Sequence, residues 1–269
     1  MKKGLFILFF LTGLCSAVAA QPPGFGAARI LPYPAVDGAE DNLGNLYLIT
    51  PRDQLIKLNE AGDSVASYNL VRRFGKLHAI DVTNPLKILL FYKDFSTVVI
   101  LDRVLSVRAT LDLRRQNILQ AGAIGLSYDN NIWVYDALEN KLKKVDENGT
   151  LLLQTPDFRT VFEKGLNPHQ IIDKDNSVYL YDSTAGLMIF DYYGTFRKRL
   201  PLTGWKALRI ADRLVFGISG RALHAYNPVT HVQERAPFPD NLNSFHQYIL
   251  GPQRLIGLGK DSLLIYSYK

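Results

Sequence analysis

The chain repeats one short pattern three times, as Gly44-Asn-Leu-Tyr-Leu-Ile, Asn131-Ile-Trp-Val-Tyr-Asp and Ser177-Val-Tyr-Leu-Tyr-Asp. Each copy begins at or directly after a Gly, Asn or Asp and continues with β-branched or aromatic residues. That composition is typical of a β-strand that follows a tight turn. Self-similarity at a regular interval indicates a protein built of structural repeats. The interval between the copies therefore decides the fold class.

Three weaker copies complete the set, at Ile88-Leu-Leu-Phe-Tyr, Leu214-Val-Phe-Gly-Ile and Leu255-Ile-Gly-Leu-Gly. The six strands then begin at residues 46, 88, 132, 178, 214 and 255, at steps of 42, 44, 46, 36 and 41 residues. A second apolar strand follows each of them eight or nine residues later. Propeller blades of four short strands have repeats of about this length. We therefore predict an all-β fold, a six-bladed β-propeller of four-stranded blades.

The sixth blade lacks a fourth strand, because the sequence stops at Lys269 directly after its third strand. A replacement is visible near the other end of the chain. The segment Ala28-Arg-Ile-Leu-Pro-Tyr-Pro resembles Glu234-Arg-Ala-Pro-Phe-Pro, which ends the outer strand of the fifth blade. We expect Ala28–Tyr33 to pair as the outer strand of the last blade. The propeller domain would then span residues 21–269 and close through backbone hydrogen bonds.

In the three strong repeats the pattern continues through the second strand to a glycine turn. These continuations read Leu55-Ile-Lys-Leu-Asn-Glu-Ala-Gly, Leu142-Lys-Lys-Val-Asp-Glu-Asn-Gly and Leu187-Met-Ile-Phe-Asp-Tyr-Tyr-Gly. This resembles the NHL-like six-bladed propellers, well in these three blades and loosely in the other three. The resemblance implies the propeller fold. It implies no single function, since such propellers include binding scaffolds, lactonases and lyases.

Residues 1–20 have the pattern of a secretory signal peptide. Lys2 and Lys3 precede an apolar run, Leu5–Leu14, and small residues lead up to Ala20. We expect cleavage after Ala20 and a periplasmic or extracellular location. Leu14 stands where a lipoprotein leader needs a small residue before its cysteine, so we do not expect lipidation. Cys15 is the one cysteine and would leave with the leader, so we expect no disulfides.

Composition excludes two classes of function. Without its first twenty residues the chain has 29 Lys and Arg against 25 Asp and Glu, a net charge of +4. A dedicated nucleic-acid binder concentrates much more positive charge, so we expect no nucleic-acid partner. No segment after the leader is long and apolar enough to cross a bilayer, which argues against an integral membrane protein.

A propeller has two faces with different loops. The connections between blades, and those from second to third strand, meet on one face, here called the upper face. The other connections form the lower face. The upper loops hold a predicted partner-binding set, namely Arg72, Arg73, Phe74, Arg114 and Arg115. Basic groups beside aromatic rings suit an anionic, sugar-like or protein partner. Solvated loops with a few buried aromatic rings are the alternative.

The lower loops have the opposite charge, with twelve acids against five cations. Two interpretations stand at this point. The acids form a charged lower surface, or they are turn-forming residues, because Asp side chains favour turns through hydrogen bonds to the backbone.

A second candidate site lies where the inner strands begin. His78, His169 and His246 occupy equivalent positions in blades two, four and six, and Trp205 takes that place in blade five. Gln170 and Gln247 follow two of the histidines. We expect these residues to surround the upper mouth of the central channel, as a ligand-binding set of His78, His169, Gln170, Trp205, His246 and Gln247. Three histidines can hold a metal or an anion. The alternative, which we favour, is that each histidine closes its own blade by hydrogen bonding.

No catalytic residues emerge from motifs. The sequence has no Gly-x-Ser-x-Gly elbow, no His-Glu-x-x-His and no phosphate loop. We expect no cofactor, and a channel metal is the alternative. Our first hypothesis is a non-catalytic binding propeller that holds a protein partner in a cell-envelope assembly. A metal-dependent hydrolase or lyase at the channel is the second hypothesis, and a carbohydrate-binding protein is the third.

Overall fold

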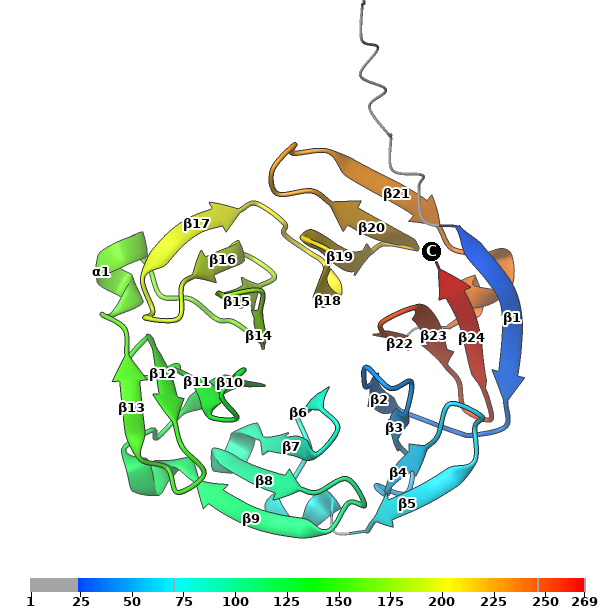
Figure 1. Cartoon of the computed structure of the whole chain (residues 1–269), viewed down its shortest axis with the longest axis horizontal. Helices are drawn as coiled ribbons and strands as arrows, with labels where there is room; N and C mark the ends of the chain where they lie inside the picture. Colours follow the sequence, from blue (N-terminus) through cyan, green and yellow to red (C-terminus); the bar gives the residue numbers. More distant parts are fainter. Residues whose placement is uncertain (1–23, 70, 246, 269) are drawn as a thin grey trace, which may run out of the picture.

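Six sheets of four antiparallel strands stand side by side around a central axis, as Figure 1 shows. The structure, a computed structural model, describes residues 24–69, 71–245 and 247–268. The predicted leader, residues 1–20, lies outside that range. The six-bladed, all-β prediction is confirmed.

The blades are numbered in chain order, and each is given from its inner to its outer strand. Blade 1 comprises β2 (Asp37–Glu40), β3 (Leu46–Ile49), β4 (Leu55–Leu58) and β5 (Ser64–Tyr68). Blade 2 comprises β6 (Ala79–Asn84), β7 (Lys87–Tyr92), β8 (Thr97–Leu101) and β9 (Val107–Asp112). Blade 3 comprises β10 (Ala121–Leu126), β11 (Ile132–Asp136), β12 (Lys141–Val145) and β13 (Leu151–Gln154). Blade 4 comprises β14 (Gln170–Lys174), β15 (Ser177–Asp182), β16 (Gly186–Phe190) and β17 (Phe196–Leu200). Blade 5 comprises β18 (Lys206–Ala211), β19 (Leu214–Ser219), β20 (Ala222–Tyr226) and β21 (Gln233–Pro237). Blade 6 comprises β22 (Gln247–Leu250), β23 (Arg254–Leu258), β24 (Leu263–Tyr268) and β1 (Phe25–Leu31).

Short helices occupy several connections of the upper face. They are η1 (Val71–Phe74), η2 (Lys93–Phe95), η3 (Leu113–Gln116), α1 (Phe158–Phe162) and η4 (Asp240–Ser244). None of the helices in the described ranges is long and apolar enough to cross a membrane.

Six apolar clusters hold the ring together, one between each pair of adjacent blades. The second and third strands of a blade are covered on both faces by their neighbours. All six residues of β7 are buried for this reason. A strand buried on both faces has no solvent side, so its sequence is continuously apolar rather than alternating. This is the physical origin of the repeated pattern that predicted the blades.

The N-terminal strand closes the ring, as predicted. β1 pairs antiparallel with β24, with Arg29 opposite Ile265 and Leu31 opposite Leu263. Its bounds differ from the expected Ala28–Tyr33, because the strand begins at Phe25 and ends at Leu31. Pro32 follows directly and has no N–H to donate to the ladder, so the strand stops there.

Candidate functional site

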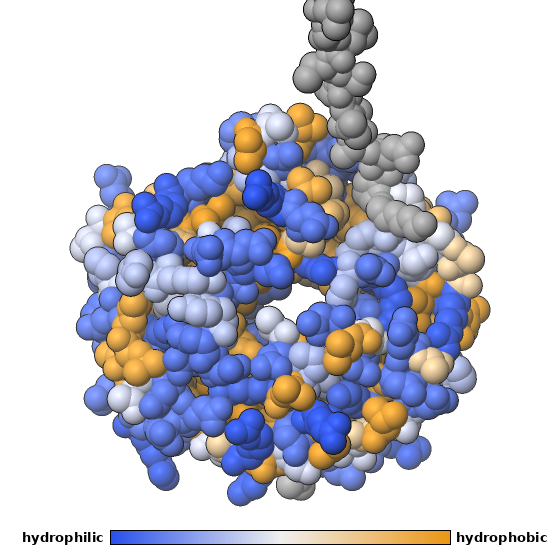
Figure 2. Space-filling model, viewed as in Figure 1, coloured by the Kyte–Doolittle hydropathy of each residue, from blue (hydrophilic) through white to orange (hydrophobic). Residues whose placement is uncertain are grey.

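A cavity of about 320 Å³ lies along the inner strands. Figure 2 shows an opening through the centre of the disk. Side chains alternate along each inner strand, as the two-residue period of a β-strand requires. On β14, Gln170, Ile172 and Lys174 are at least partly accessible, while Ile171 and Asp173 are buried in the blade. The channel wall therefore takes every second residue of these strands.

His78 and His169 have the same environment in blades 2 and 4. The backbone N–H of each donates to the last residues of the second strand, to Phe91 O at 2.8 Å and to Tyr181 O at 3.0 Å. Each ring meets that same aromatic residue edge-on, with centroids 5.7 and 5.0 Å apart. Both histidines thus close their blades, through backbone hydrogen bonds and ring packing. His246, the third of the set, lies outside the described residues.

Both imidazoles have a pKa below the ordinary value of a histidine. Desolvation by the surrounding protein lowers the pKa of His169, against a smaller opposing effect of Asp182. Desolvation also lowers the pKa of His78, and Lys93 adds to the effect. Each ring is still exposed to solvent. The neutral form that predominates at neutral pH is the form that binds metals or donates and accepts hydrogen bonds.

The predicted glutamines lie at the start of their inner strands. Gln170 Nε2 donates to Leu208 O in blade 5 at 2.9 Å, so it joins two blades. Gln247 is exposed at the start of β22. Burial raises the pKa of Asp37 in blade 1, and the Gln247 side chain partly offsets this rise. Both glutamines therefore interact with the next blade, and Gln170 also lines the channel cavity.

Trp205 requires a correction, because it does not line the channel mouth. Its side chain is 5% exposed and belongs to the apolar cluster between blades 4 and 5. The ring packs directly on Gly217, where any Cβ would overlap it. The backbone carbonyl of Trp205 accepts a hydrogen bond from the Tyr181 hydroxyl at 2.9 Å. Because Gly217 has no side chain, the indole can pack in the core at this point. The position of Trp205 in the sequence did not reveal this packing.

Four of the five predicted partner-binding residues line one groove on the outer edge of blade 2. This rim groove has a volume of about 410 Å³ and lies over β9, with walls that include Arg73, Phe74, Arg114 and Arg115. The fifth residue, Arg72, is directed elsewhere. Its guanidinium forms an ion pair with Asp53 at 2.6 Å. The structure therefore brings together residues from two successive interblade loops.

Aromatic rings lie against guanidinium groups at the rim groove: Phe74 belongs to its wall, and Phe95 lies beside it, against Arg114. The Arg73 guanidinium carbon lies 5.3 Å from the centroid of the Phe74 ring, and that of Arg114 lies 5.9 Å from the Phe95 ring. Phe74 is anchored edge-on against Tyr92, with centroids 5.6 Å apart. Phe95 remains 45% exposed. The result is a rigid apolar and cationic surface.

Asp112 sits between the two arginines of the second loop. It accepts a hydrogen bond from the Arg114 guanidinium at 3.0 Å, and this bond lowers the pKa of Asp112. Arg115 lies further away, at 3.8 Å from the same carboxylate, and its side chain is 84% exposed. Asp112 therefore orients Arg114, whereas Arg115 is available to a partner.

Four of the twelve lower-face acids form turns. In three blades the Asp after the third strand accepts backbone N–H bonds from the residues two and four positions later, at 2.8 to 3.0 Å. These residues are Asp102, Asp146 and Asp191. Asp41 accepts the same two bonds in the first turn of blade 1. Turn chemistry therefore explains these acids without an acidic partner surface.

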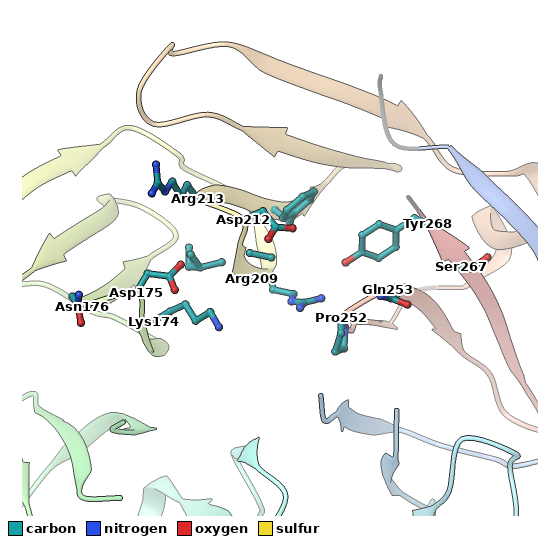
Figure 3. A pocket seen from close by; sticks show the side chains of 13 residues that line it. Lys174, Asp175, Asn176, Arg209, Asp212, Arg213, Pro252, Gln253, Ser267 and Tyr268 are labelled. Atoms are coloured by element: carbon teal, nitrogen blue, oxygen red, sulfur yellow. The ribbon is translucent and has the colours of Figure 1, made fainter. Parts of the chain in front are cut away.

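The lower face holds a second large cavity, which the sequence did not predict. This lower pocket of about 970 Å³ is bordered by Lys174, Arg209, Arg213, Phe216, Gln253 and Tyr268. Figure 3 shows the Lys174 and Arg209 side chains extending toward the same open space, with the Tyr268 hydroxyl facing it from β24. One signal in the sequence could have found Arg209. It stands between two buried apolar residues, Leu208 and Ile210, on a strand whose alternate positions face the channel.

The described part of the chain has no cluster of three His, Cys, Asp or Glu close enough to hold a metal ion. His246 lies outside that part, so the set of three histidines stays a prediction.

Comparisons with known proteins find the fold only. No family model and no curated protein matches this chain. Among solved structures, virginiamycin B lyase from Staphylococcus aureus superposes with a TM-score of 0.62 at 11% identity, covering 91% of this chain and 99% of that one. A streptogramin B lyase structure gives a TM-score of 0.57 at 13% identity, over 86% and 78% of the two chains. The Pan2 WD40 domain of Neurospora crassa gives 0.60 at 12% identity, over 87% and 89%.

Identities this low carry information about architecture and none about activity. The neighbours include lyases and a WD40 domain, so they do not select one propeller family. The NHL-like resemblance accordingly stays a prediction. What the comparisons establish is that the chain has the β-propeller fold.

Proposed function

We propose that this chain is an exported, non-catalytic binding propeller that holds a protein partner in a cell-envelope assembly through its rim groove. One observation carries the proposal. Arg73, Phe74, Arg114 and Arg115, from two different interblade loops, form the walls of a single groove. The sequence predicts these four residues as part of a partner-binding set in the upper loops, and the fold brings them together in one groove.

The chemistry of the rim groove favours a protein over a small molecule. Arginine and aromatic residues are enriched at protein interfaces and dominate their binding energy. Phe74 in the groove wall supplies apolar area at little entropic expense, since its ring is already anchored on Tyr92. The exposed Phe95 ring adds apolar area beside the groove, against Arg114. Arg73 and Arg115 supply positive charge in the groove wall. A partner with an acidic segment that carries an apolar or aromatic side chain is complementary to this surface.

A cross-linked pull-down from intact envelopes tests the proposal. The wild-type chain is expected to recover a specific partner. Combined charge reversal, Arg73→Glu with Arg115→Glu, should abolish its recovery, because both side chains then repel an acidic segment. Phe95→Ala should weaken recovery without changing the charge. Neither arginine has an ion pair closer than 3.8 Å among the described residues, so both substitutions preserve the fold.

Lys164→Glu with Lys260→Glu is the matched control. It changes the net charge by the same amount on exposed upper loops away from the groove. Recovery of the free chain alone, or of a partner that survives the groove reversal, would contradict the proposal.

Export is tested separately by fractionation and N-terminal sequencing. A mature protein that begins at Gln21 in the periplasmic or extracellular fraction supports the predicted cleavage after Ala20. An intact N-terminus in the cytoplasmic fraction would contradict it. The leader is the reason to expect export.

A further inference from the structure

The lower pocket combines free positive charge with an apolar wall. Three cations border it, Lys174, Arg209 and Arg213. Among the described residues, no carboxylate lies within ion-pairing distance of any of the three. Asp175 and Asp212 also border the pocket, which leaves one cation in excess. This differs from the upper face, where Arg72, Arg114 and Arg159 each pair with a nearby aspartate.

Arg209 is held in place at the floor of the pocket. Its Nη1 donates to the backbone carbonyl of Gly251 at 2.5 Å. The Tyr268 hydroxyl donates to the same carbonyl at 2.7 Å. Arg209 also acts on the Tyr268 hydroxyl, where it partly offsets the rise in the pKa of Tyr268 that burial causes. No carboxylate of the described residues pairs with Arg209, so its charge is available to an added anion. A guanidinium fixed in this way is prepared to bind an oxyanion, since little side-chain entropy remains to be lost.

Glu40 is not an anion that occupies the Arg209 guanidinium. Arg209 lowers the pKa of the Glu40 carboxyl, although burial raises it overall, so the two groups lie within electrostatic range. However, Glu40 Oε1 is bound by the Arg254 guanidinium at 2.5 and 2.7 Å. Arg254 therefore pairs with Glu40 through Oε1, while Glu40 Oε2 has no hydrogen-bond partner, and no ion pair joins Glu40 to Arg209 among the described residues.

Two tight turns lie next to the other two cations that border the pocket. The pairs Asp175–Asn176 and Asp212–Arg213 have positive φ at both residues, between 49° and 63°. That is the geometry of the two-residue hairpin turn that matches strand twist. Lys174 ends β14 just before the first turn, and Arg213 forms part of the second. Figure 3 shows both turns on the same side of the opening.

The size and lining of the pocket indicate more than a bare ion. At about 970 Å³, its volume is at the upper end of the range for small-molecule sites. Phe216 supplies an aromatic wall, with its ring centroid 6.2 Å from that of Tyr268. We propose that the lower pocket binds a small organic anion, a molecule with a phosphate or carboxylate group joined to an apolar body. The anionic group would lie at Lys174 and Arg209, and the apolar body against Phe216.

Isothermal titration calorimetry on the purified chain tests this with matched probes. Phenyl phosphate and benzoate carry both features, inorganic phosphate only the charge and phenol only the ring. We expect phenyl phosphate or benzoate to bind more tightly than inorganic phosphate and phenol. Raising the salt concentration should weaken binding, since a charged contact is screened. A preference between the two aromatic anions would identify the headgroup.

Three substitutions locate the site. Lys174→Ala and Arg209→Gln should each weaken binding of the better aromatic anion by about tenfold, as expected for one lost charge-assisted contact. Phe216→Ala should weaken the aromatic anion and leave inorganic phosphate unchanged. Lys174 is exposed and its side chain makes no hydrogen bond to the described residues, so Lys174→Ala remains informative if Arg209→Gln unfolds. Lys164→Ala is the control.

Wild-type protein that binds none of these anions would overturn the proposal, as would equal affinities of wild type and Lys174→Ala. The lower pocket and the rim groove share no residue. The partner test and this titration can therefore fail independently.

Discussion

The carboxylate of Asp173 accepts a hydrogen bond from the indole N–H of Trp133 at 2.9 Å, across the junction of blades 3 and 4. The same oxygen accepts from the Ser127 hydroxyl at 2.8 Å. All three side chains are buried. One inner-strand carboxylate thus joins two blades by charge-assisted bonds, which are stronger than neutral ones.

Asp173→Ala should lower the free energy of unfolding by about 3 kcal/mol, because it leaves two buried donors without an acceptor. Urea denaturation followed by tryptophan fluorescence measures this. Asp173→Asn keeps an acceptor oxygen and should lose less. Glu60→Ala, on an exposed turn, should change stability by less than about 0.5 kcal/mol. Equal stability of Asp173→Ala and Glu60→Ala would show that the Asp173 bonds contribute nothing.

The closing strand offers a matched pair of neighbouring residues. Leu31 is 8% exposed and packs in the cluster between blades 6 and 1, whereas Ile30 is 68% exposed. Leu31→Ala should lower the free energy of unfolding by about 2 to 3 kcal/mol, through lost apolar burial and the cavity left behind. Ile30→Ala should cost less than about 0.5 kcal/mol. Thermal unfolding of the two variants compares them, and equal effects would contradict ring closure by β1.

Gly217 tests the buried position of Trp205. A Cβ at Gly217 would overlap the indole, so Gly217→Ala must displace Trp205 and should destabilise the fold by about 1 to 3 kcal/mol. The displaced indole becomes more exposed, which shifts its fluorescence emission to longer wavelength. Trp133→Phe removes the other tryptophan signal from the measurement. Gly24→Ala, with no atom within 4 Å of the new methyl group, is the control. An unchanged emission spectrum would argue against the packing described.

His169 should make stability depend on pH. Desolvation lowers its pKa below the ordinary 6.5, with Lys93 assisting and Asp182 opposing. The unfolded chain then binds the proton more tightly than the folded one. The stability contributed by neutral His169 is complete above about pH 6.5 and is lost as the pH falls through that value toward the folded pKa. His169→Gln should therefore flatten the fall in unfolding free energy between about pH 7 and pH 5.

A proton NMR titration checks the cause directly. The His169 resonance, identified by its disappearance in His169→Gln, should have a midpoint below 6.5. A midpoint at or above 6.5 would contradict the desolvated environment, whatever the stability data show.

Particular residues explain how far the site could be predicted. Arg73, Phe74, Arg114 and Arg115 lie in loops that the repeat assigns to the upper face, so their grouping followed from topology. The prediction that Trp205 lines the channel was wrong, because the indole packs where Gly217, on β19, has no side chain. Arg209 was missed because its charge becomes significant only when Gly251, Tyr268 and Lys174 come from other blades to surround it.

The sequence by itself determined the six blades and the strand that closes them. Both depend on local periodicity and on the apolar runs of strands that are buried on both faces, and these patterns are visible in consecutive residues of the sequence. The tertiary structure alone decided where charge is free and where it is neutralised. Ion pairs such as Glu40 with Arg254 join residues more than two hundred positions apart, and no local pattern records which cation remains unpaired.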